Sequence, residues 1–352
     1  MKIGQKGINF IKGVIVIVTF SMALMYAEKI LTLKSRDGYC QIQSYYKQKD
    51  NTVDALFIGS SKIHCQIDTG ILWDEHGISA FDLSGAEAPV WNSYYLLREA
   101  LKTQTPKVIF FDASIIAFRQ DVLAQPEVWS MVNAYGLHMN ENRIEMLREN
   151  SIDKKMFYRL MLPLDTMHSR YNELTKDDFD SEYNSINFKG FDFRNTTVQF
   201  DEPDVSAITE DFVFDEKHEK YLRMLINYTK EKNIPLVVMT TPYVVTPNEQ
   251  GYLNYVETIC EQEGVTYIDF NKMYDELNLD FKTDMAENVH LNFSGTKKLT
   301  SYLGDYIVSN YEITDHRGDP EYSSWDVDAE RNRRNREIGD QEPVEMPEES
   351  EE

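Results

Sequence analysis

Short apolar runs alternate with amphipathic segments along most of the chain. The apolar runs have the length of buried strands and are bounded by turn or polar residues. They lie at residues 53–59, 78–83, 107–112, 235–241 and 265–270. Segments with apolar positions at helical spacing lie between or after them, at residues 67–77, 88–101, 217–232, 249–264 and 294–310. Strands that alternate with helices predict a mostly parallel sheet covered on both faces, with a ligand at the carboxyl ends of the strands.

Residues 113–213 break this alternation, because they are rich in polar and aromatic side chains and show no regular strand and helix repeat. They predict a large insertion between the third and fourth strands. An insertion at the carboxyl end of a sheet usually shapes a substrate site or a partner surface.

The N-terminal segment has the composition of a membrane anchor. Residues 13–27 carry no charge, and Lys2, Lys6 and Lys12 precede them. This pattern predicts a transmembrane helix with the N-terminus inside and the rest of the chain outside the cytoplasm. A cleaved signal peptide and a buried core helix are the alternatives. An uncleaved anchor is favoured because the exit from the apolar run has no clear cleavage site, so residues 1–34 are expected to form a cytoplasmic stub and a signal anchor.

The formal net charge of -23 excludes nucleic acid as a partner, since phosphate backbones are bound through clustered Lys and Arg. The charge is unevenly distributed. Residues 1–34 carry +4 and residues 313–352 carry -9, which leaves -18 for the body. We therefore expect a folded domain at residues 35–312 and an acidic, disordered tail at residues 313–352.

Cysteine is scarce, with Cys40, Cys65 and Cys260 far apart in the chain. This spacing excludes a zinc-binding cysteine motif and a disulfide framework, although one pair could still form a bridge. No metal or organic cofactor is implied by the sequence.

Ser61 stands in a glycine-containing turn just after the first predicted strand and before a helix. A serine in such a turn has an exposed hydroxyl, and the helix N-terminus supplies backbone N–H donors for an oxyanion. Serine is also common in turns and caps, so this turn alone has a structural reading as well.

A second candidate group precedes the last predicted helix. His290 lies three residues after Glu287, in a loop expected over the carboxyl edge of the sheet. Such a histidine can offer Nε2 to a serine hydroxyl while an acid holds Nδ1–H. Asp284 is a rival for the acid, and His290 could instead serve only as a helix-entry residue.

Together these segments resemble the SGNH (GDSL-like) hydrolase superfamily. Gly-Ser-Ser at residues 59–61 is similar to its first block, with Ser61 as nucleophile. Leu-Ser-Gly at residues 83–85 is similar to its second block, whose glycine, here Gly85, contributes an oxyanion N–H beside that of Ser61. Glu-Asn-Val-His at residues 287–290 is similar to the terminal block. The resemblance implies a three-layer α/β/α, flavodoxin-like fold.

Within the superfamily the chain is most similar to membrane-anchored extracytoplasmic members. These include the D-alanyl transfer protein of teichoic-acid modification and the alginate-type polysaccharide O-acetyltransferases. The resemblance implies acyl transfer, most simply of an acetyl group, or ester hydrolysis on a cell-envelope polysaccharide at a bacterial surface. A membrane-bound O-acyltransferase is the protein partner that it implies. The alternative is a non-catalytic protein of the same fold that binds a glycan or that partner.

The chain departs from the superfamily pattern in three places. Ser60 and Glu287 replace aspartates, and the third block's asparagine is absent, because the third predicted strand is followed by Asp112-Ala113-Ser114. Asn92 and Asn292 are the candidates for the missing side chain.

In the insertion, His168 and Arg170 lie beside Tyr171. Arginine suits a carboxylate or phosphate and tyrosine can stack on a sugar, so these residues are candidates for substrate binding. An internal ion pair is the alternative for Arg170.

Overall fold

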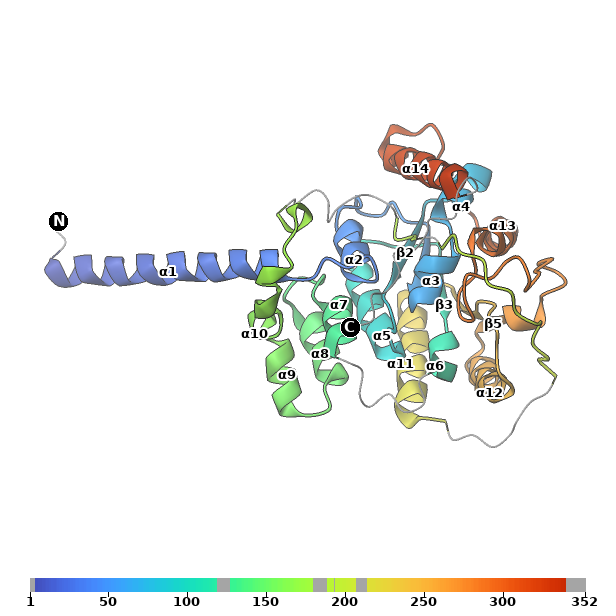
Figure 1. Ribbon diagram of the computed structural model, residues 1–352, viewed down its shortest axis with the longest axis horizontal. Coiled ribbons are helices and arrows are strands. Elements are labelled where there is room, and N and C mark those ends of the chain that lie inside the picture. The colour runs from blue at the N-terminus through green and yellow to red at the C-terminus, as the bar shows by residue number, and fades with distance from the viewer. Residues whose placement is uncertain (1–3, 119–126, 180–188, 193, 207–213, 340–352) are drawn as a thin grey trace.

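The computed structural model describes residues 4–118, 127–179, 189–192, 194–206 and 214–339 (Figure 1). Its centre is a five-stranded parallel sheet in the order β2-β1-β3-β4-β5. The strands are β1 (Ala55–Gly59), β2 (Ala80–Ser84), β3 (Val108–Asp112), β4 (Leu236–Thr240) and β5 (Thr266–Asp269). All five lie within the apolar runs that the sequence predicts, apart from Ser84 at the end of β2, so the predicted sheet is confirmed.

Alternate residues of the central strands face two separate cores. Leu56 and Ile58 of β1 lie in one core, whereas Ala55 and Phe57 of the same strand lie in the other. The first core contains helices α5 (Val90–Ala100) and α11 (Glu216–Lys232), and the second contains α4 (Thr69–His76) and α13 (Phe293–Asn310). Burial of both faces explains why the strands are continuous apolar runs, and it gives the expected three-layer α/β/α fold.

The segment between β3 and β4 is mainly helical where the structure describes it. Its elements are α6 (Ser114–Phe118), α7 (Glu127–Ala134), α8 (Glu141–Asn150), α9 (Lys154–Leu160), α10 (Pro163–Met167), η1 (His168–Asn172) and η2 (Lys176–Asp178). Met146 and Leu147 of α8 are fully buried against the first core. The remaining elements are α2 (Tyr39–Tyr45), α3 (Ser61–Gln66), α12 (Pro247–Glu263), η4 (Phe270–Lys272) and η5 (Pro320–Tyr322).

The C-terminal segment differs from the expected disordered tail. Residues 323–339 form helix α14, which packs beside α4 (Figure 1). Trp325 is 2% exposed and donates from Nε1 to the carbonyl oxygen of Ala80, while Arg336 pairs with the buried Asp68 at 2.8 Å. The expectation is therefore wrong for this helix, because its charged residues include partners of buried groups. Residues 340–352 lie outside the described part of the chain.

Helix α1 (Gln5–Leu31) projects away from the domain (Figure 1). Among the described residues it is the one helix long and apolar enough to cross a membrane, with a mean hydropathy of 2.0 over its most apolar window and none of that window buried. At 1.5 Å per residue its 27 residues extend about 40 Å, more than the roughly 30 Å of a bilayer's hydrocarbon core.

Candidate active site

Ser61 is the first residue of helix α3 and follows a tight turn formed by Gly59, the last residue of β1, and Ser60. Gly59 in this turn has a φ of +154°, and a Cβ atom there would lie 2.9 Å from the side chain of Ile63. Glycine therefore lets the chain change direction tightly between strand and helix. As a result, the Ser61 hydroxyl lies at the carboxyl edge of the sheet, in the position that the sequence predicts.

The structure brings Ser61, His290 and Glu287 together. Nε2 of His290 lies 2.9 Å from Oγ of Ser61, and Nδ1 of the same ring lies 2.5 Å from Oε1 of Glu287. His290 is 8% exposed, whereas the Glu287 side chain is 52% exposed. The three side chains form one hydrogen-bonded chain whose acid end faces solvent.

The rival acid Asp284 does not belong to this chain of hydrogen bonds. Its side chain is fully buried, and Oδ2 accepts from the backbone N–H of Asp280 and from Nζ of Lys298, each at 2.7 Å. Its carbonyl oxygen accepts from the N–H of Asn292. Asp284 therefore fixes the shape of the loop before α13, and Glu287 takes the position beside the imidazole.

Burial and charge set the protonation of this group. Burial lowers the pKa of His290 below its ordinary value of 6.5, although the hydrogen bond to Glu287 acts in the opposite direction. That same hydrogen bond lowers the pKa of Glu287. At neutral pH the site therefore holds a neutral imidazole between a hydroxyl and an ionised carboxylate, an arrangement that can move a proton from the serine.

The carbonyl oxygen of Val289, next to His290, is held by two side chains of α3. Nζ of Lys62 donates to it at 2.8 Å and Nε2 of Gln66 at 2.9 Å. Lys62 is buried and its Nζ lies 3.7 Å from the ring centre of Tyr243, and burial lowers the pKa of Lys62 to about 7. Because these two donors fix the peptide before His290, they position the imidazole relative to Ser61. Sequence reasoning missed both residues, although their spacing of four places them on one helix face.

The turn after β2 is fixed from two sides. The N–H of Ala86 donates to the carbonyl oxygen of Asp37 at 2.5 Å, and Nδ2 of Asn133 donates to the carbonyl oxygen of Ala86 at 2.9 Å. A Cβ atom on Gly85 would lie 2.0 Å from Oδ1 of Asn133, so a larger residue at position 85 would push the Asn133 side chain away from Ala86. The turn that contains Gly85 is therefore hydrogen-bonded to Asp37, in the segment that follows α1.

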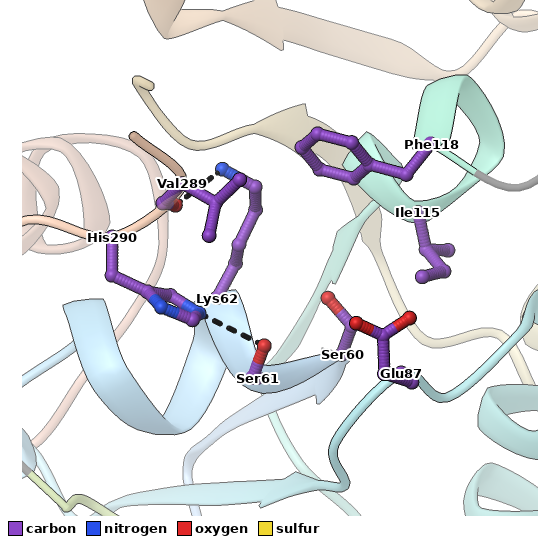
Figure 2. A pocket seen from close by; sticks show the side chains of 8 residues that line it. All are labelled: Ser60, Ser61, Lys62, Glu87, Ile115, Phe118, Val289 and His290. Carbon is purple, nitrogen blue, oxygen red and sulfur yellow. Dashed lines mark hydrogen bonds between the residues drawn. The ribbon is translucent and has the colours of Figure 1, made fainter. Parts of the chain in front are cut away.

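A cavity of about 250 Å³ opens beside the Ser61 hydroxyl (Figure 2). Figure 2 shows Ile115 and Phe118 on one side of it and the Ser61–His290 pair on another. Its lining residues are Ser60, Ser61, Lys62, Glu87, Ile115, Phe118, Val289 and His290. The insertion thus contributes an apolar wall, through α6, to a cavity that is otherwise mostly polar.

The remaining predicted site residues do not line this cavity. Asn292 caps α13, accepting from Ser294 and Gly295. Asn92 is fully buried in α5, and its side chain has no hydrogen-bond partner in the described part of the chain. At the third-block position, Asp112 accepts from the N–H and Oγ1 of Thr241, each at 2.8 Å, and so joins the ends of β3 and β4.

His168 and Arg170 lie near the end of α1. A guanidinium nitrogen of Arg170 donates to the carbonyl oxygen of Leu31 at 2.8 Å, and another pairs with Asp178 at 3.0 Å. His168 is exposed and contacts the carbonyl oxygen of Asp165. The structure therefore favours the ion-pair interpretation of Arg170 and places neither residue at the candidate active site.

Comparison with known proteins adds structural likeness only. No protein-family model matches the chain, and a search of curated proteins finds no match. A candidate acylhydrolase from Bacteroides fragilis has 10% sequence identity and a TM-score of 0.38, with 77% of this chain and 94% of that chain covered. The acetylxylan esterase Axe2 from Geobacillus stearothermophilus has 13% identity and a TM-score of 0.38, covering 73% and 94%. A candidate GDSL-like lipase from Parabacteroides merdae has 12% identity and a TM-score of 0.33, covering 72% and 94%. Similarity at this level assigns no activity to the chain, so function must be inferred from its own residues.

Proposed function

We propose that the protein carries out acyl transfer or ester hydrolysis through Ser61, acting on a cell-envelope polysaccharide. The observation that carries this proposal is the pair of hydrogen bonds from Ser61 to His290 and from His290 to Glu287, at 2.9 and 2.5 Å. A hydroxyl beside a neutral imidazole that a carboxylate orients is an activated nucleophile. The resemblance of residues 59–61, 83–85 and 287–290 to SGNH hydrolase blocks supports the same chemistry.

In the proposed reaction, Oγ of Ser61 attacks the ester carbonyl carbon while Nε2 of His290 takes the hydroxyl proton. The backbone N–H groups of Ser61 and Gly85 donate to the oxyanion that forms. The bond to the alcohol then breaks, the alcohol receives the proton from His290, and the acyl group stays on Ser61. A sugar hydroxyl or water next gives its proton to His290 and attacks the acyl carbon. Ser61 leaves and regains that proton, so transfer and hydrolysis differ only in the acceptor.

The cavity favours a short acyl group. A volume of about 250 Å³ leaves room for an acetyl ester with part of its alcohol, and Ile115 and Phe118 offer it an apolar wall. Helix α1 supports a single-pass anchor with the domain outside the cytoplasm, because lysines precede its uncharged run. A membrane-bound O-acyltransferase would then supply the acyl group on the outer side of the membrane.

A serine-directed fluorophosphonate probe and a series of esters test this proposal. We expect the probe to label Ser61 in the purified protein, and an acetyl ester to react at least about tenfold faster than an octanoyl ester of the same alcohol. Mass spectrometry of the labelled peptide identifies the modified residue. A protein that takes no label and hydrolyses no ester, yet binds an acetylated glycan, would instead be a non-catalytic binding protein.

The pH dependence of the reaction provides a second test. His290 must be neutral to accept a proton, so we expect kcat/KM to fall with decreasing pH through the pKa of His290, with a midpoint below pH 6.5. The charge of Lys62 contributes to the lowering of that pKa. Lys62→Met should therefore move the midpoint to higher pH, and it should lower kcat by about 10-fold to 100-fold because Val289 loses a donor.

Lys189→Met is the matched control for this experiment. Lys189 is also buried, burial lowers its pKa to about 7, and its Nζ lies 3.5 Å from the ring centre of Trp325, away from the cavity. We expect this variant to unfold more easily but to keep the wild-type midpoint. Equal shifts of the midpoint in both variants would contradict a specific role for Lys62.

A further inference from the structure

The part of the insertion at residues 152–179 lies at the end of the domain from which α1 leaves. Figure 1 shows α9 and α10 at this end, with α10 against the last turns of α1. The contacts are specific: Arg170 donates to the carbonyl oxygen of Leu31 at 2.8 Å, and Lys34, just after α1, pairs with Asp178 at 3.6 Å. We call residues 152–179 the collar, because they surround the exit of α1 from the domain.

The collar holds half of the large apolar side chains that are exposed among the described residues outside α1, and these include most of the strongly exposed ones. Outside α1, six described residues of this kind are at least 60% exposed, and five of them belong to the collar. These five are Ile152, Tyr158, Leu162, Tyr171 and Phe179. Five strongly exposed apolar side chains in one segment of a protein with extensive buried cores indicate a surface that lipid or another molecule covers.

The charge of the collar also differs from that of the rest of the body. It contains five basic and five acidic residues and so has no net charge, in a chain whose formal charge is -23. Most of the exported surface would be repelled by anionic headgroups, whereas the collar would not. Exposed lysines at 154 and 155 adjoin the exposed Tyr158. Tyrosine and lysine together are typical of the boundary between headgroups and hydrocarbon.

Depth along α1 places the collar at this boundary. Glu28 and Lys29 follow the uncharged run and mark where α1 leaves the hydrocarbon. The collar's contact with Leu31 is only two residues further along the helix. At 1.5 Å per residue Leu31 lies about 5 Å beyond Glu28, so the last turn of α1 reaches the headgroup region, where the collar packs against it.

We propose that the collar is a membrane-interface surface, with Tyr158, Leu162 and Tyr171 inserted among the lipid headgroups of the outer leaflet. This proposal rests on the anchoring role of α1 and does not depend on the acyl chemistry. The insertion would then have two roles, because α6 lines the cavity and the collar fixes the height and tilt of the domain above the bilayer.

Lipid quenching of site-specific fluorophores tests the proposal on the full chain in nanodiscs. Leu162→Cys and Tyr171→Cys are labelled with an environment-sensitive dye, since Cys40, Cys65 and Cys260 are buried and should not react. Val327→Cys on α14 is the matched control, because Val327 is 67% exposed and Leu162 is 62% exposed. Met25→Cys on α1 reports whether the anchor is inserted. The discs contain a phosphatidylcholine that carries a nitroxide at the headgroup.

We expect quenching by about half or more at positions 162 and 171, and by less than about a tenth at position 327. Quenching at position 25 with none at 162 and 171 would overturn the collar proposal and would indicate that a protein partner covers this surface. Absence of quenching at position 25 would overturn the anchor and the collar together. Neither result bears on labelling of Ser61 by the fluorophosphonate, so failure of the two proposals can be distinguished.

Discussion

Replacing Ser61 with alanine is expected to lower kcat by about 10³-fold to 10⁶-fold while leaving the melting temperature nearly unchanged. The hydroxyl group is the only part of the side chain removed, and its described hydrogen bond is the one to His290. Without it no acyl ester can form on the enzyme, and any remaining rate would come from polarisation of the bound ester. Initial rates of the wild type and of Ser61→Ala with an acetyl ester, each measured before and after fluorophosphonate treatment, give the size of the effect.

Ser60→Ala is the control for this substitution, because Ser60 also lines the cavity but its side chain makes no cap hydrogen bond to α3. We expect Ser60→Ala to retain more than about a tenth of the wild-type rate. If the two variants exchanged these outcomes, Ser60 would be the nucleophile.

The second large effect is expected at Glu287. Glu287→Gln should lower kcat by about 10²-fold to 10⁴-fold, because the neutral amide cannot stabilise the imidazolium that forms when His290 takes a proton. The exposed position of Glu287 favours the lower part of this range, since water partly replaces the lost carboxylate. Single-turnover rates with the acetyl ester separate this effect from a change in substrate binding.

Asp284→Asn is the matched acid-to-amide change in the same loop. Here we expect kcat within a few-fold of wild type and a loss of stability of about 1–2 kcal/mol, because Lys298 and the N–H of Asp280 lose a charged acceptor. A strong loss of kcat in Asp284→Asn with an undiminished rate in Glu287→Gln would transfer the orienting role to Asp284.

The sheet could be predicted closely from sequence because its strands are buried on both faces. Continuous apolar runs of strand length have few other interpretations when helical segments separate them. The C-terminal helix could not be predicted in the same way. Its composition is polar, and it is held by tertiary contacts such as those from Trp325 to Ala80 and from Arg336 to Asp68. A charge count cannot distinguish an acid that faces solvent from one such as Asp328, which is 1% exposed.

The candidate active site could likewise be predicted only in part from the sequence. The positions of Ser61 and His290 follow from the ends of a strand and the start of a helix, whereas the choice between Glu287 and Asp284 depends on loop geometry. An antiparallel bridge between Met285 and Leu291 closes this loop, with Asp284 buried before it and Glu287 within it. Sequence spacing alone allows either acid. The role of Lys62 depends on burial, which a lysine in sequence does not indicate.

The segment between α1 and α2 is held by contacts with the helix and with the domain, unlike a flexible linker. A flexible linker of seven residues would let the domain move through roughly 15 Å. Here Thr32 is buried, Nζ of Lys34 donates to the carbonyl oxygen of Ile30, and the carbonyl oxygen of Asp37 accepts from Ala86. Rotation of the domain about the axis of α1 therefore requires breaking contacts that also support the turn bearing Gly85. In the proposed reaction, the cavity would therefore meet the polysaccharide at one fixed distance from the bilayer, and the polysaccharide would have to move past the cavity for successive sites to react.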